Sequence, residues 1–200
     1  MNQVLVATGN PGKLVEIQSL LDDSQIVLVT PETVGVSLSI EENGDTYEQN
    51  ASLKAIAFAH ASGLTTLADD SGLEVDVLNG LPGIRSARFS PLPNASDADR
   101  RTHLLNMLRT YPRPWKAHFH CTVALATPQE KLYYAQGNCP GEIIPEERGN
   151  NGFGYDPIFL LPEINLTMAE LSMEEKNQRS HRARAIKAAL PILHSLFLKM

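Results

Sequence analysis

The stretch VLVATGNPGK, residues 4–13, decides the fold class that the sequence predicts. Its first four residues form a short apolar run, which is typical of a buried strand. The glycine-containing residues that follow predict a loop, and Pro11 is well suited to the first turn of a helix. A strand that leads directly into a helix is the first unit of an α/β protein.

The rest of the chain continues this alternation and then adds hairpins. Apolar runs predict strands at 26–29 and 66–68, the latter running into Asp69-Asp70-Ser71-Gly72. Alternating side chains predict a strand at 117–126, with 131–135 as its hairpin partner. Helices are expected after Pro11, Thr46 and Ser96 and at the C-terminus, where Pro191 predicts a kink. The fold class expected is α/β with a mixed sheet.

Length and composition limit the kinds of protein that the chain can be. Its 200 residues fit one domain, residues 1–200, with no separable linker. A formal charge of -6 argues against a nucleic acid polymer as partner. Cys121 and Cys139 lack CxxC spacing, which favours reduced thiols in a cytoplasmic protein. We expect neither a signal peptide nor a membrane span.

The loop of residues 8–13 is the first candidate site. Glycines allow the backbone to approach an anion, helix N-terminal amides point toward it, and Lys13 adds positive charge. It is not a P-loop, because Leu14 stands where Ser or Thr should hold magnesium. An ordinary turn between a strand and a helix is an equally good interpretation.

An acidic set is the second candidate, with Glu41, Glu42, Asp69 and Asp70 as its members. Carboxylates suit Mg²⁺, which typically takes one or two of them and leaves the rest of its shell to water and substrate phosphates. Strand alternation sends Asp69 and Asp70 to opposite faces, so only one of them needs to face a ligand. Ordinary turn and cap chemistry remains the alternative.

Two further segments offer contacts to a nucleobase. Phe153 lies between two glycines, so a base could stack on its ring while Asp156 accepts a hydrogen bond. Lys176 and Arg182 present only donors, which favours carbonyl or phosphate oxygens. The alternatives are an aromatic turn that packs into the core and a solvated charged face.

Together these segments resemble the inosine/xanthosine triphosphate pyrophosphatase family, over residues 5 to about 190. Each piece is short, but the ordered set is specific; the family usually has Phe at the position of Tyr47. The matching pieces are Thr8-Gly9-Asn10, Gly12-Lys13, Glu41-Glu42-Asn43-Gly44, Thr46-Tyr47, Asn50-Ala51, Lys54-Ala55, Ala68-Asp69-Asp70-Ser71-Gly72-Leu73, Leu81-Pro82-Gly83-Ile84, Ser86-Ala87-Arg88, Phe119-His120-Cys121, Phe153-Gly154-Tyr155-Asp156-Pro157, Glu175-Lys176 and Ser180-His181-Arg182.

The resemblance implies a fold, a reaction and an assembly. It implies an elongated α/β protein with two lobes around a long mixed sheet, a nucleotide site in the cleft between the lobes, and a homodimer. The implied reaction is Mg²⁺-dependent hydrolysis of non-standard purine nucleoside triphosphates (ITP, dITP and XTP) to the monophosphate and pyrophosphate. This reaction would remove such nucleotides from the cytoplasmic pool.

The resemblance also assigns roles to residues. Asp70 would be the catalytic base and a metal ligand, with Glu42, Glu41 and Asp69 as further metal ligands. The implied substrate-binding residues are Thr8, Gly9, Asn10, Pro11, Gly12, Lys13, Lys54, Ser71, Phe153, Gly154, Tyr155, Asp156, Lys176, His181 and Arg182.

Two alternatives stay open at this point. The septum-formation-inhibitor type nucleotide pyrophosphatases share the reaction and differ in the base pocket. A nucleotide sensor would bind without hydrolysis, although two adjacent carboxylates facing a polyanion disfavour it. If Arg182 and His181 donate to a carbonyl at ring position 6, ITP and XTP should be good substrates, GTP poorer and ATP worst.

Overall fold

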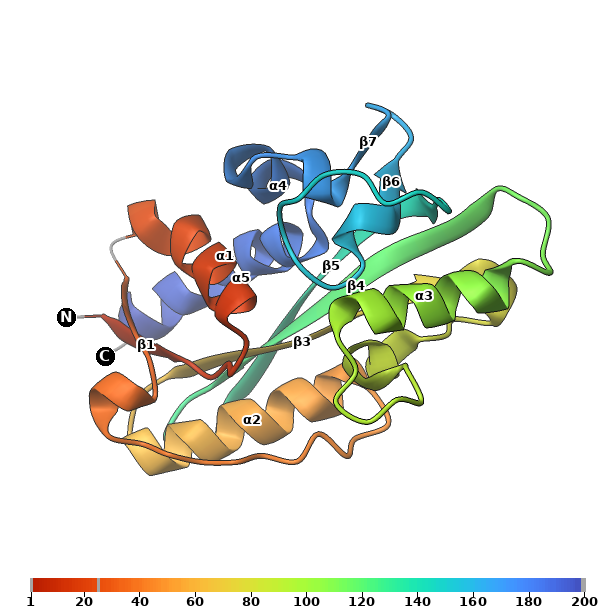
Figure 1. Ribbon diagram of the computed structural model, residues 1–200. Helices are drawn as coiled ribbons and strands as arrows, with labels where there is room; N and C mark the ends of the chain where they lie inside the picture. The colour runs from red at the N-terminus through yellow and green to blue at the C-terminus, as the bar shows by residue number, and fades with distance from the viewer. Residues whose placement is uncertain (1, 25, 199–200) are drawn as a thin grey trace. The chain divides into compact units, whose positions relative to one another are not determined.

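The computed structural model describes residues 2–24 and 26–198 and contains one seven-stranded sheet (Figure 1). The strands lie in the order β2-β1-β3-β4-β5-β6-β7. β1 is parallel to β2 and β3, whereas β6 is antiparallel to β5 and β7. The predicted α/β fold with a mixed sheet is thus confirmed. The strands are β1 (Gln3–Val6), β2 (Val27–Val29), β3 (Thr66–Val75), β4 (Trp115–Ala126), β5 (Leu132–Ile143), β6 (Phe159–Leu161) and β7 (Leu166–Thr167).

Capping residues set the helix boundaries much as the sequence predicts. Asn10 caps α1, Thr46 accepts from the Gln49 amide at the start of α2, and Ser96 caps α3 through a capping box. Gly63 ends α2 in the left-handed conformation. The α-helices are α1 (Pro11–Leu21), α2 (Tyr47–Ser62), α3 (Asp97–Leu108), α4 (Met173–Arg179) and α5 (His181–Leu198), with Pro191 inside α5.

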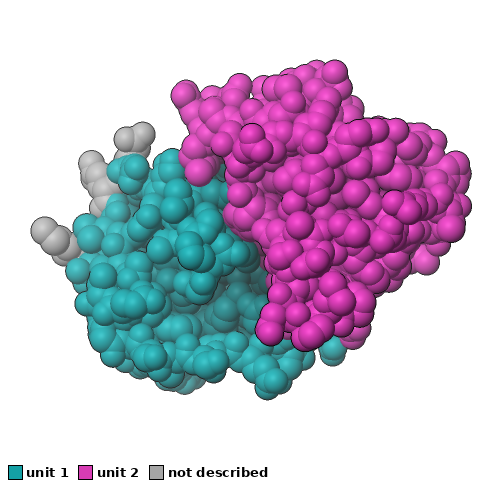
Figure 2. Space-filling view, in the orientation of Figure 1, with its two compact units in different colours: residues 1–70, 121–137, 181–200 teal, residues 71–120, 138–180 magenta. Residues whose placement is uncertain are grey.

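The chain divides into two compact units (Figure 2). Unit 1 comprises residues 1–70, 121–137 and 181–200, and unit 2 comprises residues 71–120 and 138–180. Each unit has apolar clusters of its own, so each is described separately below.

In unit 1, helices cover both faces of the sheet (Figure 1). α1 and α5 pack against each other and against Leu67 and Cys121 on one face. α2 packs its alanines against Ala68 and Ala124 on the other face. Residues 67 and 68 therefore point to opposite faces, and the same alternation continues into the acidic residues that follow.

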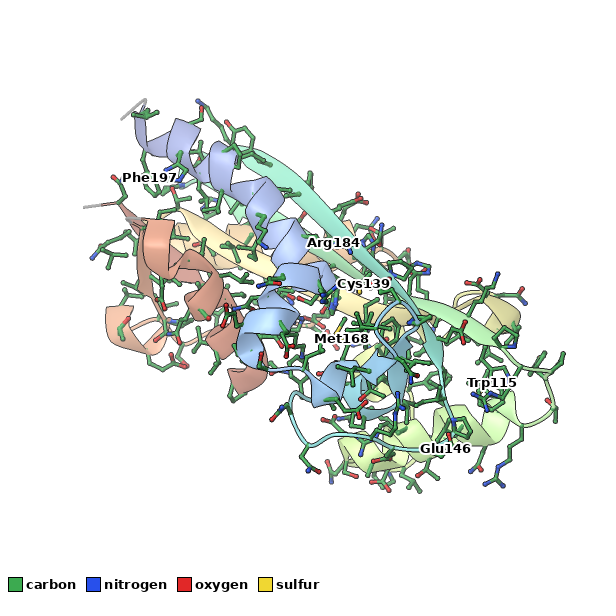
Figure 3. All side chains as sticks on the ribbon, turned by 90° about the horizontal axis from the view of Figure 1, so that it is seen from above. Trp115, Cys139, Glu146, Met168, Arg184 and Phe197 are labelled. Carbon is green, nitrogen blue, oxygen red and sulfur yellow. The ribbon has the colours of Figure 1, made fainter. Side chains whose placement is uncertain are left out.

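The core of unit 2 lies around the first half of β4, the second half of β5 and the whole of β6. Trp115, Cys139 and Met168, all labelled in Figure 3, belong to it. The Phe119 and Phe159 rings pack there with centroids 4.4 Å apart. Leu104 and Leu108 of α3 are completely buried in the same cluster, which fixes α3 on this unit.

The structure corrects one prediction about β3. The sequence predicts a strand that ends at residue 68, but the strand continues to Val75. Asp69, Asp70, Ser71 and Gly72 therefore lie within a strand and not at its end. The strand continues because Leu73 and Val75 are fully buried, and burial outweighs the low strand propensity of Asp and Gly.

None of the helices in the described residues combines the length and the apolar character needed to span a bilayer.

Candidate functional site

Asp69 and Asp70 are neighbours on β3, yet their carboxylates have different surroundings within unit 1. The Asp69 carboxylate lies on the face that α1 and α5 cover, and Asp69 is 1% exposed. Its Oδ2 lies 3.0 Å from Lys13 Nζ and 3.2 Å from Arg182 Nε. The Cys121 thiol also points at this oxygen, at 3.9 Å. Asp69 is thus enclosed by two cations.

The pKa shifts on this face keep Asp69 and Arg182 charged. Burial raises the pKa of Asp69, but Lys13 and Arg182 outweigh it and hold the pKa well below the usual range. Burial lowers the pKa of Arg182, and Asp69 and Glu16 more than reverse this. Burial beside Asp69 raises the pKa of the Cys121 thiol to about 12, so this thiol stays protonated. Asp69 and Arg182 therefore form a permanently charged ion pair.

Helix positions explain how these side chains meet. Lys13 and Glu16 are three residues apart on α1, so they share one face of the helix. Arg182 is the second residue of α5, 1% exposed, and its Nη1 donates to the Glu16 carboxylate. Glu16 is itself 3% exposed. Arg182 therefore links α1, α5 and β3 inside unit 1.

Gly137 of β5 allows α5 to start where it does. A Cβ at this position would lie 2.2 Å from the His181 carbonyl oxygen and 2.5 Å from the Ala185 nitrogen. The backbones of β5 and α5 thus come closer than any side chain would permit. The buried His181 lies at this approach.

The other carboxylate, Asp70, faces α2. Its Oδ2 accepts a hydrogen bond from Asn50 Nδ2 at 3.0 Å, and Asn50 is fully buried. Burial raises the pKa of Asp70, although Lys13 and Lys54 act in the opposite direction and Glu42 adds a smaller rise. Asp70 is therefore a carboxylate that gains a proton more readily than an exposed one.

Lys54 of α2 connects Glu42 to β3. Its Nζ lies 2.5 Å from Glu42 Oε1 and donates to the Asp69 carbonyl oxygen at 2.6 Å. Burial lowers the pKa of Lys54, but the charges of Asp69 and Glu42 outweigh burial and raise the pKa above its usual value. The ammonium therefore stays charged. Glu41, next to Glu42, is exposed.

The carboxylates fit magnesium unequally. Among residues 2–24 and 26–198 no group of three or more His, Cys, Asp or Glu side chains is arranged to hold a metal ion. Mg²⁺ commonly needs only one or two carboxylates when substrate phosphates complete its shell. Asp70 and Glu42 suit that requirement, because both carboxylates contact residues of α2, Asp70 through Asn50 and Glu42 through Lys54. Asp69 does not, because its side chain is completely buried and its Oδ2 already pairs with two cations.

The loop before α1 is open enough for an anion. Asn10 Oδ1 accepts from the amides of Gly12 and Lys13, at 2.9 and 3.2 Å, so these two amides are already used within the loop. Thr8 Oγ1 accepts from the Asn10 amide at 3.2 Å. No atom lies within 4 Å of a Cβ built on Gly9, which is exposed. Gly9, Asn10 and Pro11 are all exposed.

In unit 2, Asp156 organises the glycine-rich loop. Its Oδ2 accepts from the Phe153 amide at 2.9 Å and from Lys176 Nζ at 2.6 Å. The Lys176 ammonium lies 5.2 Å from the centre of the Phe153 ring. A Cβ on Gly152 would lie 2.0 Å from Asp156 Oδ2, and its φ of 76° also favours glycine. Gly152 is thus required for this arrangement.

The two aromatic residues of this loop differ. Tyr155 is 4% exposed, belongs to the core of unit 2, and donates from its hydroxyl to the Ser86 carbonyl oxygen at 2.9 Å. Burial raises the pKa of Tyr155, so the hydroxyl stays protonated. Phe153 is only half-buried. Phe153 is therefore the better candidate for stacking on a base.

The structure thus gathers the predicted residues into two groups. Lys13, Glu42, Lys54, Asp69, Asp70, His181 and Arg182 lie in unit 1, and Ser71, Phe153, Gly154, Tyr155, Asp156 and Lys176 lie in unit 2. Sequence reasoning assigned no role at the site to Glu16, Asn50, Gly137, Asp97 or Arg101. One signal was available for Glu16, which follows Lys13 at helical spacing.

The chain matches the model of the Ham1 family over residues 4–192. It is 42% identical to a dITP/XTP pyrophosphatase of Desulforamulus reducens, over 98% of both chains. It is 46% identical to one of Geobacter sulfurreducens, over 93% of this chain and 94% of that protein.

Solved structures give the same result. A HAM1 protein from Coxiella burnetii is 40% identical and superposes with a TM-score of 0.88, covering 98% of this chain and 100% of that one. The Ham1 protein of Staphylococcus aureus is 39% identical with a TM-score of 0.85, covering 97% and 99%. The predicted resemblance is confirmed: the chain belongs to the Ham1 family and is an enzyme of that family.

Proposed function

We propose that this protein hydrolyses dITP, XTP and ITP, with Mg²⁺ as cofactor, to the nucleoside monophosphate and pyrophosphate. The observation that carries the proposal is the pair of carboxylates Asp70 and Glu42, which α2 holds through Asn50 and Lys54. The relatives named dITP/XTP pyrophosphatase supply the substrate class.

Asp70 is the general base in this proposal. Its carboxylate takes a proton from the attacking water as the water oxygen bonds to the α-phosphorus and the bond to the β-phosphate oxygen breaks. Pyrophosphate leaves with the electron pair of that bond. Burial raises the pKa of Asp70 toward the operating pH, which improves a carboxylate as a base. The hydrogen bond from Asn50 holds the carboxylate in one orientation.

Lys13 and Lys54 take the charge of the triphosphate. Both ammonium groups are largely buried, with side-chain exposures of 15% and 13%, so their attraction to phosphate is weakly screened. The open backbone at Gly9 leaves room for phosphate oxygens. Mg²⁺, held by Asp70 and Glu42, would neutralise charge that develops on the phosphate oxygens.

The loop of unit 2 recognises the base. Phe153 offers its ring for stacking, and Lys176 offers a donor to the carbonyl at ring position 6. Adenine has an amino group there, so donors would face donors and remain unpaired. We therefore assign the hydrogen bond to this carbonyl to Lys176 and not to Arg182, because Arg182 is enclosed by Glu16 and Asp69. Arg182 instead holds α5 and Asp69, and His181 stays a candidate contact.

Product analysis on a panel of nucleoside triphosphates tests the proposal. With Mg²⁺ present we expect pyrophosphate, and not orthophosphate, from dITP, XTP and ITP. GTP should be much poorer and ATP poorest, by about 10⁴-fold if the hydrogen bond to the carbonyl decides selectivity. Chelation of Mg²⁺ should abolish release.

Other outcomes of the same panel would identify another function. Equal hydrolysis of ATP and ITP would contradict the base pocket. Preference for dTTP or UTP would indicate the activity of the septum-formation-inhibitor type enzymes. Binding of ITP with no release of any product would indicate a sensor.

We also propose a homodimer in the cytoplasm, both from the family resemblance. Light scattering at micromolar concentration should give twice the chain mass of 21.9 kDa. A single species of 21.9 kDa would contradict the dimer.

A further inference from the structure

Two residues of α3 hold both backbone groups of Gly154. Asp97 Oδ2 accepts from the Gly154 amide at 2.7 Å. Arg101 Nη1 donates to the Gly154 carbonyl oxygen at 2.8 Å. Asp97 and Arg101 are four residues apart, so they lie one above the other on the same face of α3. A single residue of the loop is therefore fixed on both sides of its Cα by one helix.

Each of these side chains is itself held in place. Arg101 also donates from Nε and Nη2 to the two oxygens of Glu147, at 2.8 and 2.9 Å, which is the bidentate geometry that fixes a guanidinium most firmly. Asp97 pairs with Arg100, and the Ser96 capping box fixes the start of α3 beneath it. The Arg101 side chain is 12% exposed, so the guanidinium that holds Gly154 is largely buried, whereas its partner Glu147 lies at the surface.

Gly154 needs such support. Its φ is 60°, and no atom of the described residues other than its two chain neighbours lies within 4 Å of a Cβ built on it, so packing does not hold this point of the loop. Phe153, immediately before it, is anchored on the other side through Asp156 and Lys176. The position of the Phe153 ring therefore depends on two anchors, of which the α3 clamp is one.

We propose that Asp97 and Arg101 are positioning residues for the nucleobase, because they fix Gly154 and with it the Phe153 ring. This inference rests on the proposed function. Loss of the clamp would let the loop leave the conformation that receives the base, so the apparent affinity for a nucleotide would fall. The groups of unit 1 that contact phosphate would be unaffected.

Steady-state kinetics of Arg101→Met separate this role from a general effect on the fold. For dITP we expect KM to rise about tenfold, the loss that one hydrogen bond to a charged group represents. The inhibition constant of pyrophosphate, which carries no base, should change less than about twofold. Asp97→Ala, which removes the acceptor for the Gly154 amide, should act in the same way.

Two further variants complete the experiment. Arg101→Lys keeps one donor and the charge and should recover part of the lost affinity. Arg109→Met serves as the matched control, because Arg109 is an exposed arginine at the other end of α3. Its KM should equal that of the wild type.

The outcomes distinguish the inference from the function on which it rests. An unchanged KM in Arg101→Met, or a pyrophosphate constant that rises in parallel with KM, would overturn the clamp. Wild-type protein that releases no pyrophosphate from dITP or XTP would contradict the proposed function instead. In that case the affinity for IMP, measured by calorimetry, replaces KM as the test of the clamp. Equal affinity in the wild type and Arg101→Met, or no binding by the wild type, would overturn the proposed positioning role.

Discussion

The Asn50 side chain joins Asp70 to the segment that carries Glu42. Its Nδ2 donates to Asp70 Oδ2 at 3.0 Å, while its Oδ1 accepts from the Gly44 amide at 2.8 Å. A Cβ on Gly44 would lie 2.9 Å from Asn50 Oδ1, so glycine is what allows this approach. The two carboxylates that we propose as magnesium ligands are thus positioned by one fully buried amide.

Asp70→Asn should abolish turnover and leave the fold intact. An amide oxygen can still accept the hydrogen bond from Asn50, but it cannot take a proton from water. General-base contributions amount to about 10²–10⁴-fold, and loss of a metal ligand adds to this. The measurement is kcat for dITP together with the melting temperature. A kcat near that of the wild type would exclude Asp70 as the base.

Glu42→Gln should raise the Mg²⁺ concentration needed for half-maximal rate. A neutral amide is a poorer ligand for this hard cation than a carboxylate. The rate is measured against free Mg²⁺, with Glu41→Gln as the matched control because Glu41 is exposed. A shift in the control and none in Glu42→Gln would move the ligand role to Glu41.

Asp69→Asn should destabilise the protein without shifting the Mg²⁺ curve. The substitution leaves Lys13 without its buried counter-charge and leaves Arg182 with Glu16 alone, and breaking a buried ion pair typically costs about 3–5 kcal/mol. Urea unfolding measures the loss. A Mg²⁺ curve displaced as far as that of Glu42→Gln would show instead that Asp69 is a ligand.

Asp97→Asn should make the free energy of unfolding less dependent on pH in the acid range. Burial raises the pKa of Asp97, but the hydrogen bonds from Arg100 and the Gly154 amide outweigh it and lower the pKa below 3.8. A depressed folded-state pKa contributes stability that is present above the unfolded value and is lost as the pH falls through the folded one. The wild type should therefore lose stability more steeply than the variant below about pH 4. Parallel urea midpoints for the two proteins would contradict this.

The sequence predicts the framework of unit 1 well, because its signals are local. The apolar run before Gly9, the Pro11 start of α1 and the Thr46 cap of α2 each depend on residues within one turn of each other. The alternation rule also predicts that Asp69 and Asp70 face opposite ways, and their different partners confirm it.

Sequence-based prediction fails where the structure depends on contacts between residues far apart in the chain, or where the composition of a segment is typical of another kind of structure. The Asp-Asp-Ser-Gly run has the composition of a loop, yet it lies within β3 because the sheet buries Leu73 and Val75 beyond it. The alternation of Leu73, Glu74 and Val75 was the available signal. The pairing of Arg182 with Glu16 joins residues 166 positions apart, and no local pattern reports such a contact.

The close approach of Gly137 to α5 has a consequence for how freely this sequence can vary. A single added methyl group at position 137 would meet the His181 carbonyl oxygen and the Ala185 nitrogen, which are backbone atoms and cannot rotate away. It would have to displace the start of α5, and Arg182 would move with it. In a library of random variants, position 137 should therefore tolerate almost no replacement. The few folded variants with another residue at position 137 should carry a second substitution that restores the distance between β5 and α5.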